Sequence, residues 1–435
     1  MSHPLFICQS MAEKLRDPKT VEELAEISTS QINRPSSLWQ SPSFADGFAG
    51  ISYFYSLMDR AFPGEGWGVA AQHYLLEALS SFKKNQSVNC SLFKGLSGIS
   101  LAMESIQHRP DKFQQFHAGL DDWIIEEVNQ SYLVETSKFL NEETLIPPFF
   151  YGFTPGLSGI TAYLLSRKDN PYLQQLAKLC AEHLANMMLS KKRVGSLQVR
   201  AWYFTQDLLM DPYRSPDIEG GYNTSMFYGV TGCLMALSSA IIHGVCSDDI
   251  YKAVECIAFW IKDTYQYIFK DCYWNATVSV EGNVSALPPT YRELENSWLL
   301  GWPPVAKSLF LAGKAIKDET LLQFSKDLCS VFNLTSPSFF LGGFSFCLGI
   351  SGFVSTLYSL SKEINNSSLL QTIRRLNEDC IRSFDPSSPF GFPQLSISED
   401  EKTCWVESPS LASGSAGIGL SILIAEEKCG QPLFA

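Results

Sequence analysis

Apolar residues in this chain recur at helical spacing in a series of short runs, and each run follows a turn of small residues. After the turn that ends at Gly50, the apolar side chains share one face of a helix: Ile51, Tyr53, Phe54, Leu57 and Met58. The residues after Gly98 and Gly417 repeat this pattern. Each run therefore predicts a helix with a wide apolar surface, as in a protein interior.

More polar segments lie between these runs. They carry several charged residues and a single apolar stripe, and they span residues 74–82, 172–189, 250–264 and 320–332. One apolar stripe is typical of a helix that covers a core with one face and meets water with the other. The chain thus predicts pairs of an inner and an outer helix.

The turns before the inner helices share the form G-x-[AST]-G, except for a degenerate copy at 300–304. Seven leading glycines recur about 50 to 70 residues apart: Gly47, Gly95, Gly156, Gly229, Gly301, Gly349 and Gly414. A period of this size is one supersecondary unit, and stacking such units buries the faces that neither helix can bury alone. We therefore predict an all-α fold over residues 1–435, a single α/α toroid whose inner-helix N-termini line one rim.

Three stretches interrupt the helical pattern. We interpret residues 107–150 as a small accessory insertion of α+β type. Residues 190–225 and 265–295 contain strand-like runs, such as 273–278, and we interpret them as long loops or hairpins over one rim.

Composition narrows the function classes. Hydrophobic residues make up 45% and charged residues 18% of the 435 residues, which suits a large buried core. The net charge is −12 and no basic cluster exceeds residues 191–193, so nucleic acid is not an expected partner. An acidic chain is compatible with a cationic peptide partner, but charge alone carries little weight.

The cysteines and the N-terminus indicate a compartment. Twelve cysteines are spread singly with no C-x-x-C pair, which favours buried free thiols in a reducing environment. Residues 1–8 do not have the character of a signal peptide, and no apolar run reaches the ~18 residues that span a bilayer. We expect a cytoplasmic protein without a transmembrane segment.

Seven glycine turns along nearly the whole chain resemble the lanthionine synthetase C (LanC) family, the cyclases of class I lanthipeptide biosynthesis. The similarity is closest in residues 410–420, in 221–224 leading to Gly229, and in Gly301 leading to 309–315. The resemblance implies an α/α toroid. It also implies an enzyme that adds cysteine thiols to dehydrated Ser or Thr of a precursor peptide.

The resemblance implies a zinc site as well, and this chain departs from it. In the family, two Cys and one His bind zinc, the metal activates the thiol, and a further His protonates the enolate. Here the three ligand positions hold Leu299, Cys347 and Leu348. The positions of the catalytic His and of a family Arg hold Tyr228 and Glu295, and Gly152 stands where we expect an acidic residue.

These departures set the cofactor expectation. Leucine offers no lone pair to a metal, so one surviving cysteine cannot complete a closed zinc site. We therefore predict no metal and no other cofactor, although zinc is expected for the family. A relocated Cys/His site remains an alternative.

Each candidate residue also has a structural interpretation. Cys347 is either a reactive thiol with a lowered pKa at a helix N-terminus or an inherited buried residue. Tyr228 is either a proton donor or a stacking residue. Asp46 caps its helix or contacts a peptide. The remaining candidates for a peptide-binding cavity are either lining residues or core and surface residues: Trp298, Trp302, Phe346, Glu295 and Arg292.

Two hypotheses on function follow. The first is a zinc-independent cyclase-like enzyme of lanthipeptide biosynthesis that acts on a precursor peptide by orienting thiol and alkene. The second is a non-catalytic pseudo-cyclase that binds the precursor peptide or scaffolds a dehydratase and a transporter.

Overall fold

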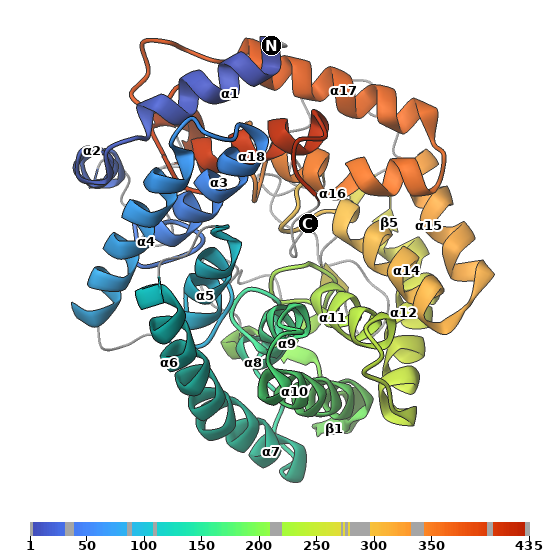
Figure 1. Ribbon diagram of the computed structural model, residues 1–435. Coiled ribbons are helices and arrows are strands. Elements are labelled where there is room, and N and C mark those ends of the chain that lie inside the picture. The colour runs from blue at the N-terminus through green and yellow to red at the C-terminus, as the bar shows by residue number, and fades with distance from the viewer. Residues whose placement is uncertain are drawn as a thin grey trace.

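The fold is a closed ring of helices in two layers (Figure 1). The computed structural model describes residues 3–30, 39–84, 89–107, 111–208, 220–270, 273–274, 277–278, 296–331, 343–397 and 403–430. The inner layer consists of α3 (Phe48–Ala61), α5 (Leu96–Ser105), α9 (Leu157–Ser166), α11 (Val230–Ile242), α14 (Trp302–Ile316), α16 (Ile350–Glu363) and α18 (Ser415–Ala425). Each inner helix begins directly after one of the leading glycines, as the turns predict.

The outer layer covers the inner one. It consists of α4 (Trp67–Lys84), α6 (Asp111–Glu127), α10 (Pro171–Leu189), α12 (Asp248–Ile268), α15 (Glu319–Val331) and α17 (Ser367–Arg382), with α1 (His3–Lys14) in the last position. Helix α1 packs against α17 and α18, so the N-terminal helix supplies the outer partner of the seventh repeat. Helix α2 (Pro18–Ser30) packs against α4. The predicted toroid is confirmed.

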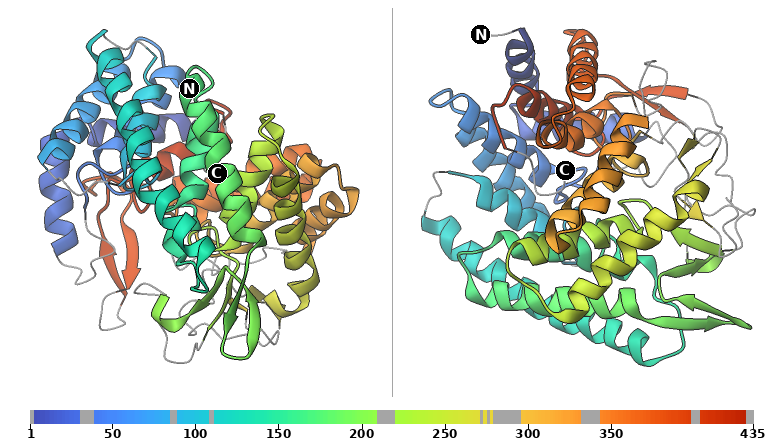
Figure 2. Two further views of the ribbon diagram at one scale, coloured as in Figure 1. Left: turned by 90° about the horizontal axis from the view of Figure 1, so that it is seen from below. Right: turned by 90° about the vertical axis from the view of Figure 1, so that its right-hand side faces the viewer.

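Short strands gather at one end of the ring (Figure 2). Strand β1 (Lys191–Val194) pairs with β2 (Leu197–Arg200), and β4 (Gly220–Asn223) pairs with both β3 (Tyr203–Thr205) and β7 (Thr277–Val278), all antiparallel. Two further hairpins join β5 (Phe269–Lys270) to β6 (Tyr273–Trp274) and β8 (Gln394–Ile397) to β9 (Thr403–Val406). The hairpins expected in 190–225 and 265–295 are therefore present in their described parts, whereas β8 and β9 were not predicted.

Residues 107–150 differ from the prediction. Instead of an α+β insertion, residues 111–141 form α6, the π-helical segment η2 (Val128–Leu133) and α7 (Val134–Asn141), followed by α8 (Pro148–Tyr151). The described part of this stretch contains no strand. Its aromatic and acidic residues belong to α6, the outer helix of the second repeat, and to its extension. A short helix, η3 (Gln206–Leu208), completes the elements.

The second glycine of each turn explains why the motif recurs. A Cβ added at Gly98 would lie 2.5 Å from the Cβ of Phe44, which belongs to the preceding turn. Each such contact joins the second glycine of one turn to the residue three positions before the leading glycine of the previous turn: Gly159 to Leu92, Gly232 to Phe153, Gly352 to Trp298, Gly417 to Phe346 and Gly50 to Leu411. The last pair connects the seventh turn to the first. Glycine is required there because any side chain would separate adjacent repeats.

The small polar residue of the motif has its own role. The hydroxyl groups of Ser97, Ser158, Thr231 and Ser351 each donate a hydrogen bond to the carbonyl oxygen seven residues earlier, at 2.5–2.6 Å. These hydroxyls lie in the core, where an unpaired polar group costs about 1–3 kcal/mol. Each turn is thus held by a hydrogen bond within it and by the contact of its second glycine with the neighbouring turn. These two contacts fix the residues that precede the inner helix.

Candidate functional site: the rim at the inner-helix N-termini

The residues that directly precede the leading glycines stand together at one end of the ring. We call this set the rim: Asp46, Lys94, Pro155, Tyr228, Leu300, Leu348 and Ser413. Following the order of the turns, three neighbouring members are polar and the other four are aromatic or apolar. Lys94 and Ser413 are exposed, Leu300 is buried, and the others are half-buried. The rim therefore has a polar arc, formed by Ser413, Asp46 and Lys94, and an apolar arc, formed by Pro155, Tyr228, Leu300 and Leu348.

Backbone hydrogen bonds between consecutive turns hold the rim in place. They run from Met226 N to Leu299 O, Leu299 N to Cys347 O, Cys347 N to Ala412 O, Ala412 N to Ala45 O, and Ala45 N to Phe93 O, at 2.8–3.2 Å. A further bond joins Phe153 N to Phe227 O at 3.0 Å. Turns from distant parts of the sequence thus become neighbours with a fixed register.

The structure brings together the residues at the implied ligand positions. The Leu299 N–H donates to the carbonyl of Cys347 at 2.9 Å, and Leu348 is the next residue. Two leucines and one thiol do not fit a zinc ion, which needs three or four N, S or O ligands. Among the residues that the structure describes, no group of three His, Cys, Asp or Glu side chains could hold a metal. We derive no chemical step through zinc, and the absence of a metal stays a prediction.

Cys347 does not have the properties of an activated thiol. Burial raises the pKa of its thiol well above the ordinary value, and the negative charge of Asp46 raises it further. The lowered pKa proposed for a thiol at a helix N-terminus is therefore not found. Cys347 is half-buried and packs at the edge of the core.

Asp46 contacts the seventh turn instead of its own helix. Helix α3 begins at Phe48 after the N-cap residue Gly47, and no side chain caps it, so the capping interpretation of Asp46 is wrong. Its Oδ1 accepts hydrogen bonds from Ser413 Oγ at 2.8 Å and Ser410 Oγ at 3.2 Å. Burial raises the pKa of the Asp46 carboxyl, against the opposing effects of Ser413, Lys94 and Ser410.

Tyr228 lies on the apolar arc. Its ring meets that of Phe227 edge-on with centroids 4.2 Å apart, and burial raises its pKa to about 12. The phenol is therefore protonated near neutral pH and able to donate a hydrogen bond. Its role as a proton donor in a reaction stays a prediction.

The tryptophans and Phe346 lie beneath the rim. Trp298 and Trp302 have no exposed surface and Phe346 has 1%. Trp298 packs against Phe93 and Phe346 at centroid distances of 5.5 Å, and Trp302 donates to Asn296 Oδ1 at 2.8 Å. Their burial supports the packing interpretation and gives no support to a role in lining a groove. Arg292 and Glu295 lie outside the described residues.

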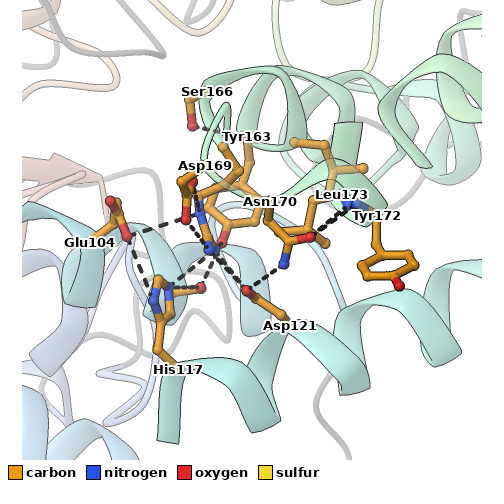
Figure 3. Close-up of polar contacts among 12 residues, drawn as sticks. Glu104, His117, Asp121, Tyr163, Ser166, Asp169, Asn170, Tyr172 and Leu173 are labelled. Atoms are coloured by element: carbon orange, nitrogen blue, oxygen red, sulfur yellow. Dashed lines mark hydrogen bonds and ion pairs between the residues drawn. The ribbon is translucent and has the colours of Figure 1, made fainter. Parts of the chain in front are cut away.

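A second polar cluster, which the sequence did not indicate, lies between α5, α6 and α9 (Figure 3). We call it the Arg167 network: Ser100, Glu104, His117, Asp121, Tyr163, Arg167, Asp169 and Asn170. Arg167 Nη1 and Nη2 donate to the two carboxylate oxygens of Asp121 at 2.7 and 2.8 Å. Nη1 also donates to Tyr163 OH at 2.8 Å and lies 3.1 Å from His117 Nε2.

The rest of the Arg167 network completes these contacts. Arg167 Nε donates to Asp169 Oδ1 at 3.0 Å, and this contact lowers the pKa of Asp169. Asn170 donates to Asp121 at 3.0 Å while it caps α10 through its side-chain oxygen. Asp121 and Arg167 are 46 positions apart, so no sequence spacing could have paired them.

Comparisons with known proteins agree with the architecture. The family model described as "Lanthionine synthetase C-like protein" matches residues 38–428. A curated relative, the nisin biosynthesis protein NisC of Lactococcus lactis subsp. lactis, is 21% identical over 328 residues, which cover 73% of each chain. A solved structure of a nisin cyclase superposes with a TM-score of 0.72 over 96% of each chain at 18% identity.

The match of the family model to most of the chain shows that this protein belongs to the lanthionine synthetase C-like family. At 18% identity the solved structure supports the fold alone. The resemblance found in the glycine turns is thereby confirmed. Within the described residues, no helix is both long and apolar enough to cross a membrane.

Proposed function

We propose that this chain acts in lanthipeptide maturation as a zinc-independent, cyclase-like enzyme on a dehydrated precursor peptide. The proposal is supported by one observation above all: the turns and backbone bonds that build the rim are intact, while the implied metal positions hold Leu299, Cys347 and Leu348. The family scaffold is thus retained without its metal chemistry.

The reaction needs little beyond positioning. A thiol loses its proton, its sulfur bonds to the β-carbon of a dehydrated Ser or Thr, the alkene electrons move to an enolate, and the α-carbon takes a proton. A free cysteine is already a few per cent thiolate at neutral pH. Holding the two groups together replaces a bimolecular encounter and can contribute about 7–11 kcal/mol in the best cases. A chain of this kind would accelerate ring closure by restricting the peptide.

The apolar arc offers a surface for such a peptide. Tyr228 and Leu348 are half-buried, and Pro155 completes their side of the rim. An apolar surface favours peptide side chains by roughly 25 cal/mol per Å² of apolar area removed from water.

The test is a cyclisation assay with a dehydrated precursor that carries one cysteine. Thiols that remain free are alkylated at timed intervals and counted by mass spectrometry, with and without the protein. We expect faster loss of free thiol with the protein present. Equal rates would refute the cyclase proposal. Elemental analysis of the same protein, purified without chelator, tests the metal prediction independently, and one zinc per chain would overturn it.

A second function is favoured by the raised pKa of Cys347. A rim whose own thiol is protonated and where leucine stands at two of the three implied ligand positions fits a non-catalytic pseudo-cyclase that binds the precursor peptide or scaffolds a dehydratase and a transporter. Binding of the precursor without any rate acceleration would identify this alternative. A pull-down with the dehydratase and transporter tests the scaffold role.

A further inference from the structure

The polar arc contains a hydroxyl cluster around one carboxylate. Ser410 Oγ and Ser413 Oγ lie 2.9 Å apart and both reach Oδ1 of Asp46, and Ser408 Oγ lies 3.1 Å from Ser410 Oγ. Both hydroxyls thus engage the same carboxylate oxygen. Among the residues that the structure describes, both side-chain donors to Asp46 reach Oδ1 and none reaches Oδ2.

The environment of Asp46 suits proton transfer. The groups that face it are Lys94 on the second turn, Cys347 on the sixth, and the serines of the seventh. Burial raises the pKa of Asp46 and so brings it closer to the pKa of a thiol. A smaller difference between the two pKa values favours proton transfer between the two groups. The two serines fix the orientation of the carboxylate, so it needs no rearrangement before it reacts.

Asp46 also lies beside the implied ligand position. Cys347 N donates to Ala412 O and Ala412 N donates to Ala45 O, so a continuous chain of backbone bonds joins Cys347 to the residue before Asp46. The negative charge of Asp46 contributes to the raised pKa of the Cys347 thiol. A thiol from a peptide that reaches this part of the rim would meet the same carboxylate.

We propose that Asp46 carries the proton in thiol addition at the rim, an inference that rests on the function proposed above. The Asp46 carboxylate takes the proton from the peptide thiol through Oδ2, and the thiolate sulfur forms the bond to the β-carbon. The alkene electrons pass to the enolate, and the Asp46 carboxyl returns its proton to the α-carbon. The carboxylate is restored, so the step needs no oxidant, reductant or metal. Ser413 and Ser410 are positioning residues.

The experiment compares the wild-type protein with Asp46→Asn, Asp46→Glu, Ser413→Ala and a control. The control is Asp249→Asn, because Asp249 is an exposed carboxylate on α12 that pairs with Lys252 of the same helix. The substrate is the dehydrated precursor with one cysteine. The readouts are the rate of thiol loss, the configuration at the new α-carbon, and the affinity for the precursor.

Proton delivery from a fixed carboxyl gives one configuration, whereas protonation by water gives a mixture. We expect Asp46→Asn to slow ring closure about 100-fold and to yield both configurations, with an affinity within about twofold of wild type. Asp46→Glu should recover part of the rate, and Ser413→Ala should lose about threefold to tenfold while shifting the pH profile. Asp249→Asn should match wild type.

The outcomes separate the two proposals. If wild type does not accelerate ring closure, the cyclase function fails and this inference fails with it. If wild type is active and Asp46→Asn retains both its rate and a single configuration, only the inference fails. Loss of peptide affinity in Asp46→Asn would show a binding residue instead of a proton carrier, which also overturns it. If Asp46→Asn does not fold, Asp46→Glu and Ser413→Ala decide through configuration and pH profile.

Discussion

The Arg167 network and the polar arc of the rim are both polar clusters around a carboxylate, and their contacts differ in kind. In the network, both oxygens of Asp121 are bound by Arg167, and Arg167 is only 2% exposed. On the rim, Asp46 is held through one oxygen by neutral hydroxyls and remains half-buried. A fully paired cluster stabilises the helices around it, whereas a partly paired one at an accessible edge can act on a ligand.

The largest effect that tests this comparison is Arg167→Ala. The substitution leaves Asp121 buried without its charge partner, and breaking such a pair costs about 3–5 kcal/mol of unfolding free energy. Urea denaturation measures it. Arg382→Ala is the control, because Arg382 is exposed and pairs with Glu378 and Asp379 on its own helix α17, so a change within about 0.5 kcal/mol is expected. Similar changes in the free energy of unfolding for both variants would show that the Arg167 network does not stabilise the fold.

Alanine substitutions at two glycines test the same comparison, one in a glycine turn and one on α6, which carries His117 and Asp121 of the Arg167 network. A Cβ at Gly98 would lie 2.1 Å from Leu92 O and 2.5 Å from Phe44 Cβ, so Gly98→Ala should cost about 1–3 kcal/mol. Gly119 lies on α6 between His117 and Asp121 with nothing within 4 Å, so Gly119→Ala should gain about 0.4–1 kcal/mol. Denaturation midpoints measure both. Tolerance of Gly98→Ala would contradict the packing that we assign to the turns.

Removing the charge at each carboxylate gives a smaller contrast between the two clusters. Asp121→Asn leaves one acceptor oxygen where the carboxylate offered two to Arg167, and it should lower the free energy of unfolding by about 1–3 kcal/mol. Asp46→Asn should change the free energy of unfolding by less than about 0.5 kcal/mol at pH 7, because its oxygen can still accept from the serines.

The sign of the pH dependence at Asp46 follows from its raised pKa. Ionisation of Asp46 costs folding free energy above the unfolded pKa of about 3.9, and Asn carries no such cost. Relative to wild type, Asp46→Asn should therefore gain stability as the pH rises from about 4 to 7. Denaturation at several pH values measures this. An opposite slope would show that the charge of Asp46 stabilises the fold.

The smallest effect concerns Cys347. The charge of Asp46 contributes to its raised pKa, so Asp46→Asn should lower that pKa and increase the thiolate fraction at a fixed pH. A change of about half a pKa unit gives about threefold faster alkylation. Peptide-resolved mass spectrometry follows Cys347 separately from the other cysteines, with Asp249→Asn as the reference. An unchanged rate would mean that Asp46 and the thiol are not coupled.

The candidate site was only partly predictable. Asp46, Tyr228, Cys347 and Leu348 were found because each lies within two residues of a leading glycine, and a turn fixes its neighbours locally. The hydroxyls of Ser410 and Ser413 were visible in the sequence, but nothing local joins them to Asp46, which lies 364 and 367 positions away. The burial of Trp298 and Phe346 likewise depends on turns that lie far away in the sequence.

The sequence by itself determined the ring, because a repeated turn with small residues leaves each helix pair dependent on its neighbours for burial. It also determined that two of the three implied metal positions hold leucine, Leu299 and Leu348, and that the third holds Cys347. Only the tertiary structure decided that α1 completes the seventh pair, that residues 111–141 are helical, and that Arg167 meets Asp121. The reason is physical: turn chemistry and helical spacing act over a few residues, whereas contacts across a closed ring depend on how all the repeats pack together.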